Sequence, residues 1–198
     1  AGSSFHLHAS LWDKGLKKNL LWDERKKAAT PLFGSVTAGS LALARDFSLF
    51  FAPTVNSYKR YVASSFAPTK LAWGRDNRTC GFRVVGGGGS FRLENRVPGA
   101  DANPYLAFAA TIAAFLHGAE KGLKTPREFT GDAYHAKGLA EVPRSLGEAA
   151  HCWEASAAAR SAFGPAVHRH YLRAARWELE CFERAVTCWE RARYFERI

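Results

Sequence analysis

The chain has 198 residues, of which 47% are hydrophobic, and this length and composition fit one globular domain with a sizeable core. Its formal net charge of +10 at pH 7 suits either a nucleic-acid surface or a binding site for anions. Because no apolar run could span a membrane, no signal peptide is recognisable and the four cysteines lack CxxC spacing, we expect a cytoplasmic protein with reduced thiols.

Residues 2–12 alternate between polar and apolar side chains and predict a strand. One face carries Phe5, Leu7, Ala9 and Leu11. The other face carries His6, His8 and Ser10. Imidazole is a common metal ligand and a good phosphate partner. Taken alone, a His-x-His pair is more often a polar strand face than a metal site, so both readings stay open.

The segment 13–36 is polar, contains Pro31, and is expected to form a surface loop. In residues 37–51 the apolar side chains recur at helical spacing, which predicts a buried helix that Pro53 ends. The following residues, 53–60, predict a short turn or helix.

Residues 70–75 and 78–85 have the pattern of strands. Arg78 and Arg83 have opposite parity, so a straight strand would place them on opposite faces. If both reach one ligand, the chain must bend or Arg78 must precede the strand.

A run of four glycines, Gly86 to Gly89, separates this strand from the next and is expected to be a tight connector. It lacks the GxxxxGK[ST] pattern of a P-loop. In residues 90–97, alternation puts Arg92, Glu94 and Arg96 on one face of a strand. Guanidinium suits phosphate and carboxylate, and a carboxylate among arginines can bind Mg²⁺ or Mn²⁺. The alternative is a solvated ladder of ion pairs.

The rest of the chain predicts helices joined by a loop at 122–144. Asn103 and Pro104 are an N-cap and first helical residue, and that helix should run to about Gly118. A capping box at Ser145-x-x-Glu148 opens a helix to about Ala159, and Gly164-Pro165 opens a last helix to about Tyr194. Three histidines are expected to have no chemical role: His117 as a packing residue, and His168 and His170 as surface residues.

Several motifs together resemble glutamine synthetases. They are Gly2-Ser3-Ser4-Phe5-His6-Leu7-His8-Ala9-Ser10-Leu11, Asn56-Ser57-Tyr58-Lys59-Arg60, Asn77-Arg78 with Arg83, Arg92-Leu93-Glu94-Asn95-Arg96, and Asn103-Pro104-Tyr105. The resemblance implies an α+β fold, an antiparallel curved sheet with helices packed on one side. It implies that residues 1–198 are the C-terminal part of the catalytic domain, without the N-terminal β-grasp domain and the first part of the catalytic domain.

The resemblance also implies an ATP-dependent ligase that joins the γ-carboxylate of L-glutamate to an amine through γ-glutamyl phosphate, using Mg²⁺ or Mn²⁺. By position, the metal ligands are His6 and Glu94. The ATP-binding residues are His8, Ser10, Arg78, Arg83 and Arg92, and Arg78 is also the catalytic arginine at the transferred phosphate. The glutamate-binding residues are Gly2, Arg60 and Arg96. When full length, such a protein forms a homo-oligomeric ring, a dodecamer, and the isolated chain is expected to be inactive.

Two departures from the family pattern bear on the substrates. Ala1 stands where glutamine synthetases usually carry Asn next to the substrate glycine, a position that belongs to the glutamate contact. Phe66 stands where ammonia-using enzymes carry a glutamate. Phe66, as a candidate amine-site residue, favours the γ-glutamylpolyamine and γ-glutamylethanolamide synthetase branch. The alternative is an ammonia-using glutamine synthetase. A distant alternative is a basic nucleic-acid-binding module, which would need Phe82 and Phe91 on an exposed sheet, whereas their alternation predicts core positions. We expect no nucleic-acid or membrane partner.

Overall fold

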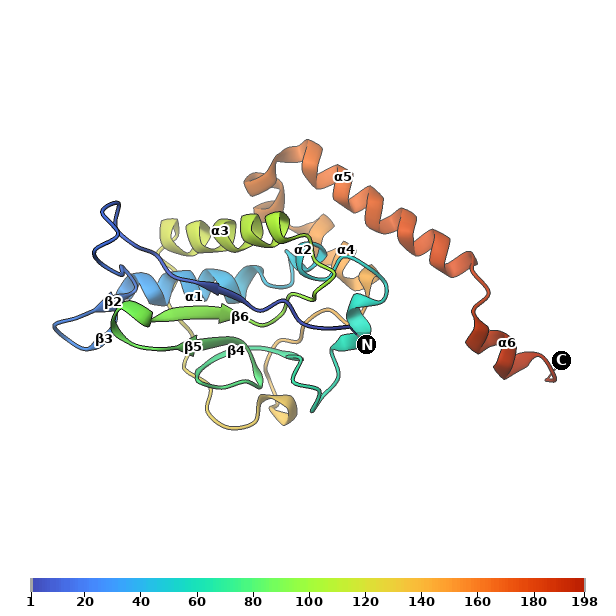
Figure 1. Ribbon diagram of the computed structural model, residues 1–198. Coiled ribbons are helices and arrows are strands. Elements are labelled where there is room, and N and C mark those ends of the chain that lie inside the picture. The colour runs from blue at the N-terminus through green and yellow to red at the C-terminus, as the bar shows by residue number, and fades with distance from the viewer. Residues whose placement is uncertain (1, 198) are drawn as a thin grey trace.

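Helices cover one face of a four-stranded sheet in the computed structural model, which describes residues 2–197 (Figure 1). The strand order is β1 (Leu7–Ala9), β6 (Arg92–Asn95), β5 (Cys80–Val85) and β4 (Lys70–Arg75). The two helices that lie over the sheet are α1 (Pro31–Leu43) and α3 (Pro104–Glu120). The expected fold, a sheet with helices packed on one side, is confirmed.

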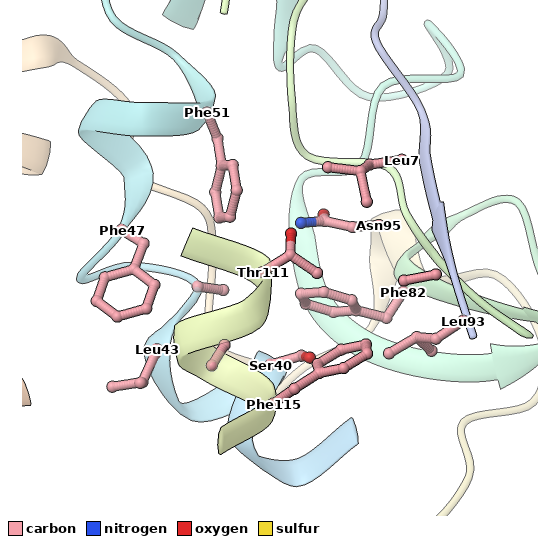
Figure 2. Close-up of a pocket in the computed structure, with 13 residues that line it drawn as sticks. Leu7, Ser40, Leu43, Phe47, Phe51, Phe82, Leu93, Asn95, Thr111 and Phe115 are labelled. Atoms are coloured by element: carbon pink, nitrogen blue, oxygen red, sulfur yellow. The ribbon is translucent and has the colours of Figure 1, made fainter. Parts of the chain in front are cut away.

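Alternation along the strands divides the sheet into an apolar and a charged face. Leu7, Phe82 and Leu93 point from the sheet toward α1 and α3 and line a small cavity between the layers (Figure 2). Its volume is about 10 Å³, so it has barely the room of one water molecule and is part of the core. Residues 6, 8, 83, 94 and 96 have the opposite parity and face away from the helices.

One strand pair differs from the expected antiparallel sheet, because β4 and β5 run parallel. Lys70 pairs with Cys80, so residues 76–79 carry the chain back along the full length of β4. Five extended residue steps span about 17 Å, which is enough for this return. Asp76 starts it with a left-handed φ of 48°. Arg78 lies in this connection and precedes β5, one of the two arrangements that its parity with Arg83 allowed.

The N-terminal third holds more structure than the sequence predicted. Only Leu7–Ala9 of the expected 2–12 strand is extended in the sheet, and the expected loop 13–36 contains a hairpin of β2 (Trp22–Asp23) and β3 (Ala28–Ala29). α1 starts at Pro31, earlier than the predicted 37–51 helix, because Thr30 caps it and proline suits its first position. A separate short helix, α2 (Ser48–Phe51), follows.

The expected turn at 53–60 contains the 3-10 helix η1 (Ser57–Arg60). There are two further short 3-10 helices. One is η2 (Gly88–Ser90), which overlaps the end of the glycine connector, and the other is η3 (Ala133–His135), within the loop after α3. Asn103 caps α3 as predicted, although that helix runs to Glu120.

α1 and α3 approach each other so closely that only glycine fits at the crossing. A Cβ on Gly39 would lie 2.2 Å from the carbonyl oxygen of Ala114, and one on Gly118 would lie 2.0 Å from that of Ser35. This contact packs the C-terminal half of α3 directly against α1.

The C-terminal region forms α4 (Leu146–Ala155), α5 (Ala157–Arg184) and α6 (Cys188–Tyr194). The helix predicted to end at about Ala159 ends earlier, at Ala155, because Ser156 stops α4 and caps α5. α5 includes a kink at Gly164, and the predicted continuous helix to Tyr194 is interrupted before Thr187, which caps α6. Figure 1 shows α5 extending away from the sheet and ending in α6.

The prediction that His168 lies at the surface was wrong. This side chain is only 3% exposed, and its ring stacks on Trp153 with 5.3 Å between ring centroids. Its Nε2 lies 2.7 Å from the Trp153 carbonyl oxygen, and the Trp153 indole N–H donates to the His168 carbonyl at 2.9 Å. These reciprocal contacts join α5 to α4, which explains the burial that helical spacing alone did not reveal.

In the described residues all four cysteines are free thiols. None of the described helices has both the length and the hydropathy needed to cross a membrane.

Candidate active site

Glu94 is the centre of a charged cluster on the sheet face that points away from the helices. It is 2% exposed, and each of its oxygens accepts from an arginine: Oε1 from Arg96 Nη1 at 2.8 Å and Oε2 from Arg83 Nη1 at 3.0 Å. Burial alone would raise the pKa of Glu94, but hydrogen bonds from His6 and Arg83 and the charge of Arg96 lower it to about 2. The carboxylate is therefore ionised throughout the ordinary pH range.

Two histidines lie against this carboxylate: His8, which is in β1, and His6, the residue before β1. His6 Nδ1 is 3.1 Å from Glu94 Oε1, and His8 Nε2 is 3.8 Å from the same oxygen. The strand register explains this, because His8 pairs directly with Glu94 across β1 and β6. Desolvation lowers the pKa of His8, partly opposed by the nearby Glu94 charge, so this imidazole is neutral at neutral pH.

Arg92 contacts His8, whereas Arg83 and Arg96 bind Glu94. Arg92 Nε donates to His8 Nδ1 at 3.1 Å, and Arg92 Nη1 donates to the Ser90 carbonyl oxygen at 2.8 Å. The alternative of ion pairs along one strand, Arg92–Glu94–Arg96, is therefore not what forms. Arg83 of the neighbouring strand pairs with Glu94 in the place of Arg92. The register places Arg83 opposite Glu94, and this pairing could not be read from one strand.

Ser10 lies further along the segment that contains β1, beside the glycine connector. Its hydroxyl oxygen accepts from the Trp12 indole N–H at 2.9 Å. A Cβ on Gly89 would lie 3.6 Å from the Trp12 ring, so this indole covers the connector. Trp12 shares the parity of His8 and Ser10, a signal that the sequence prediction did not use.

Arg60 comes from a distant part of the chain and contacts the backbone of the residue that follows Arg96, just after the end of β6. Arg60 is buried and donates from Nη2 to the carbonyl oxygen of Val97, the residue after Arg96. Its guanidinium also lies 4.9 Å from the centre of the Tyr61 ring. A guanidinium at this position is a donor of the kind that binds carboxylates.

Phe66 borders the same end through its backbone. Its carbonyl oxygen accepts from Arg96 Nη2 at 3.3 Å, while the side chain is 74% exposed and the backbone has a left-handed φ of 60°. The aromatic ring therefore projects from a strained turn beside the cluster and is free to meet a ligand.

Arg78 and Gly2 lie outside the Glu94 contacts. Arg78 is exposed and forms no hydrogen bond or ion pair within residues 2–197; it lines a separate surface hollow with Asp76 and Glu128. Gly2 is exposed, and a Cβ there would meet nothing within 4 Å. Ala1, the other N-terminal position of interest, lies outside the described residues.

Asp76 is a member of the cluster that the sequence prediction missed. It accepts from Arg83 Nε at 2.8 Å and also pairs with Nη2 of the same guanidinium. Arg83 thus links Asp76 to Glu94. The partner of Asp76 depends on the tight connection between β4 and β5, which local sequence patterns do not predict.

The donor set fits part of a divalent metal site. His6 Nδ1 faces Glu94, which leaves Nε2 as the free nitrogen, and Nε2 is buried without a hydrogen-bond partner in the described chain. An imidazole and a carboxylate this close together are two donors of the kinds that divalent metal ions bind. Residues 2–197 contain no group of three or more His, Cys, Asp or Glu side chains placed to hold a metal, so further ligands would have to come from elsewhere.

Residues 1–194 match the family described as glutamine synthetase, catalytic domain. The chain is 49% identical over 197 residues to gamma-glutamylethanolamide synthetase of Streptomyces coelicolor, covering 100% of this chain and 42% of that protein. It is 40% identical over 202 residues to type-1 glutamine synthetase 2 of Dictyostelium discoideum, covering 100% and 39%.

A solved structure of GmaS, in its apo form without ligand, has a similar fold. The TM-score is 0.87 at 30% sequence identity, and the match covers 98% of this chain and 45% of that chain. This chain therefore spans less than half the length of the proteins that it matches.

Proposed function

This chain belongs to the glutamine synthetase catalytic-domain family, and on that premise we propose that it is part of an ATP-dependent ligase joining L-glutamate to an amine. The observation that carries the proposal is the convergence of His6, Arg83 and Arg96 on the buried carboxylate of Glu94. Such a cluster combines guanidinium donors for anions with a carboxylate and an imidazole for a divalent cation.

Each residue of the cluster has a role in this reaction. We assign the His6 imidazole and the Glu94 carboxylate to Mg²⁺ or Mn²⁺, which when bound would supply positive charge against the phosphate oxygens of ATP. Arg83, Arg92, His8 and Ser10 bind ATP, and Arg78 reaches the transferred phosphoryl group. Arg60, Arg96 and the backbone at Gly2 bind glutamate.

The reaction proceeds in two steps. An oxygen of the glutamate γ-carboxylate attacks the γ-phosphorus of ATP, the bond to the β-phosphate oxygen breaks, and ADP leaves. The nitrogen of the amine then attacks the γ-carbonyl carbon of γ-glutamyl phosphate, phosphate leaves with the bonding electrons, and the nitrogen loses a proton. The arginines stabilise the charge on the transferring phosphoryl group, which is the main contribution that a protein makes to phosphoryl transfer.

The rest of the protein would complete this site. Since residues 2–197 contain no group of three or more side chains placed to hold a metal, we propose that the remaining carboxylate ligands lie outside this chain. We also propose that the full-length protein works as a homo-oligomeric ring, a dodecamer. Residues 1–198 alone are expected to have no ligase activity.

Phe66 is the basis for proposing an alkylamine as the second substrate. Ammonium is small and strongly hydrated, so its binding requires a carboxylate that replaces water and takes a proton. The exposed ring of Phe66 instead offers a surface for an alkyl chain and a face that attracts a cation by roughly 0.5–2 kcal/mol. Putrescine, spermidine and ethanolamine are the amines to test first, and the 49% identity to an enzyme named for γ-glutamylethanolamide supports this choice.

Glutamine synthesis from ammonium is the second candidate. The 40% identity to a type-1 glutamine synthetase supports it, because that level of similarity is not far below 49%. In that case another carboxylate would bind ammonium and Phe66 would have no role in the amine site.

Phosphate release distinguishes the two candidates. With the full-length enzyme, glutamate and ATP at fixed concentrations, we expect the highest kcat/KM for one of the alkylamines. Phe66→Glu should shift the ratio toward ammonium by about 10-fold, a change of about 1.4 kcal/mol in relative transition-state stability. If ammonium has the highest kcat/KM of the panel with the unaltered enzyme, the amine assignment is wrong.

A further inference from the structure

Asp76 lies at the point where β4 has ended and the chain begins its return to β5. Its backbone N–H donates to the carbonyl oxygen of Val84 at 3.0 Å, so this residue is attached to β5 beside Arg83. Its φ of 48° is left-handed, a conformation that few residues other than glycine adopt, although aspartate and asparagine adopt it more readily than most. The backbone thus brings Asp76 next to Arg83.

Two carboxylates hold the guanidinium of Arg83. Asp76 Oδ1 accepts from Nε at 2.8 Å and also from Nη2, and Glu94 Oε2 accepts from Nη1 at 3.0 Å. All three nitrogens of the guanidinium therefore have a partner. Glu94 alone makes only one of these hydrogen bonds, which leaves the plane of the group free to turn about that contact. The two contacts with Asp76 fix the plane.

Two donors of Arg83 remain after these contacts. A guanidinium has five N–H groups, and the three hydrogen bonds leave one on Nη1 and one on Nη2 without a partner in the described chain. Paired N–H groups of a guanidinium can bind two oxygens of a phosphate at once. The Arg83 side chain is 14% exposed, so a ligand can reach it, whereas its carboxylate partners restrict how it can move.

Stability does not explain the pairing of Asp76 with Arg83. The Asp76 side chain is 79% exposed, and ion pairs with so exposed a partner contribute little to folding. The hydrogen bonds from Arg83 lower the pKa of Asp76, so the carboxylate is ionised at neutral pH and accepts from the guanidinium there. The competing explanation is that the residue at position 76 was selected for the left-handed backbone alone, and the test must separate the two.

We infer that Asp76 is a positioning residue, whose carboxylate sets the plane of the Arg83 guanidinium so that the two remaining N–H groups meet the phosphates of ATP. The identity of the anion as ATP rests on the proposed function. Because Asp76 acts through Arg83, its removal matters only while the arginine is present.

The test begins with Asp76→Gly and Asp76→Asn in the full-length enzyme. Both new residues suit a left-handed backbone, but only asparagine keeps an oxygen that can accept from Arg83. For Asp76→Gly we expect the KM for ATP, and the Kd of ATP measured by calorimetry with Mg²⁺ but without glutamate or amine, to rise about 10-fold, because ordering Arg83 then becomes a cost of binding. The KM for glutamate should stay within about twofold. Asp76→Asn should stay within about threefold of the unaltered enzyme, since a neutral acceptor bonds less strongly than a charged one.

Arg83→Lys shows whether Asp76 acts through Arg83. Lysine keeps a positive charge beside Glu94 but has no planar fork to orient. In this background Asp76→Gly should change the Kd of ATP by less than about twofold, because residues that act together have non-additive effects. Lys27→Gly is the matched control, since Lys27 is exposed, has a φ of 49° and pairs with Glu24 between β2 and β3. It should leave ATP binding unchanged.

Three results would overturn the inference. They are unchanged ATP binding in Asp76→Gly, which would leave the backbone as the explanation; equal losses in Asp76→Gly and Asp76→Asn, which would indicate charge and not orientation; and a full loss that persists in the Arg83→Lys background. The proposed function can fail separately. If the unaltered enzyme makes no γ-glutamyl amide but Asp76→Gly still weakens ATP binding, the assignment of Asp76 stands and the reaction is wrong.

Discussion

Glu94 is held by residues of three different segments, and this explains both its acidity and its fixed position. His6 comes from the N-terminal segment, Arg83 from β5, and Arg96 from the end of β6. A buried carboxylate with these partners is already organised before any ligand binds. Preorganised charges of this kind contribute to catalysis because they need not rearrange during the reaction.

Glu94→Gln tests this residue directly in the full-length enzyme. Glutamine keeps the shape but removes the charge that the buried Arg96 faces, so we expect a loss of about 1–3 kcal/mol in unfolding free energy and a folded protein at 25 °C. Amide formation should fall at least about 100-fold, as for removal of one strong electrostatic group. Steady-state rates and thermal unfolding measure the two effects.

The control for this substitution is Glu180→Gln, which removes an exposed carboxylate paired with Arg184 on α5. It should change neither rate nor stability measurably, because exposed ion pairs contribute little. Near-normal turnover of Glu94→Gln at ordinary Mg²⁺ concentrations would remove Glu94 from the metal site.

At the scale of single residues, the sequence predicted which charged side chains lie on the same face of a strand, but not which of them contact each other. His6, His8, Glu94 and Arg96 follow from alternation within their segments. The replacement of Arg92 by Arg83 at Glu94 depends on strand register, and the burial of His168 depends on tertiary packing. Local patterns contain neither kind of information.

At the scale of elements, the contact between α1 and α3 holds the layer that supports the charged sheet face. The two helices pack through Gly39 and Gly118, and α1 also contacts β4. The cavity between helices and sheet shown in Figure 2 has a volume of about 10 Å³, so the core is closely filled there. Rigid support on one face allows the charged residues to keep their geometry on the other.

Gly39→Ala is expected to lower stability, because the new Cβ would lie 2.2 Å from a backbone carbonyl oxygen that has little freedom to move. Overpacking of this kind costs about 1–3 kcal/mol or more. Thermal unfolding of the full-length protein should therefore show a lower melting temperature. Gly147→Ala, where a Cβ would meet nothing nearer than 3.8 Å, is the control and should be neutral or slightly stabilising. Equal melting temperatures for the two variants would contradict the close crossing.

Element types were more predictable than their limits. The signals at Asn103-Pro104 and Ser145-x-x-Glu148 correctly marked helix starts, because capping is a local interaction. The same signal at Thr30-Pro31 was overlooked, so α1 was expected to start too late. The parallel pairing of β4 with β5 could not be predicted, since it depends on where the short connection returns the chain.

At the scale of the whole molecule, the chain presents a site that is only partly enclosed. The charged face of the sheet lies on the side opposite the helices. The two relatives that this chain matches, from Streptomyces coelicolor and Dictyostelium discoideum, are more than twice as long as the chain. The C-terminal helices continue outward from the body, with Trp177 and Trp189 exposed. We therefore expect the remainder of the full-length protein to cover the charged face and to add metal ligands.

The central claim is that this site makes γ-glutamyl amides from alkylamines in preference to glutamine. The most direct test is a competition in which the full-length enzyme receives glutamate, ATP, Mg²⁺ and equal concentrations of ammonium and one amine, with products identified by mass spectrometry. We expect γ-glutamyl amide to exceed glutamine for at least one of putrescine, spermidine and ethanolamine. Glutamine as the main product in every mixture would contradict it.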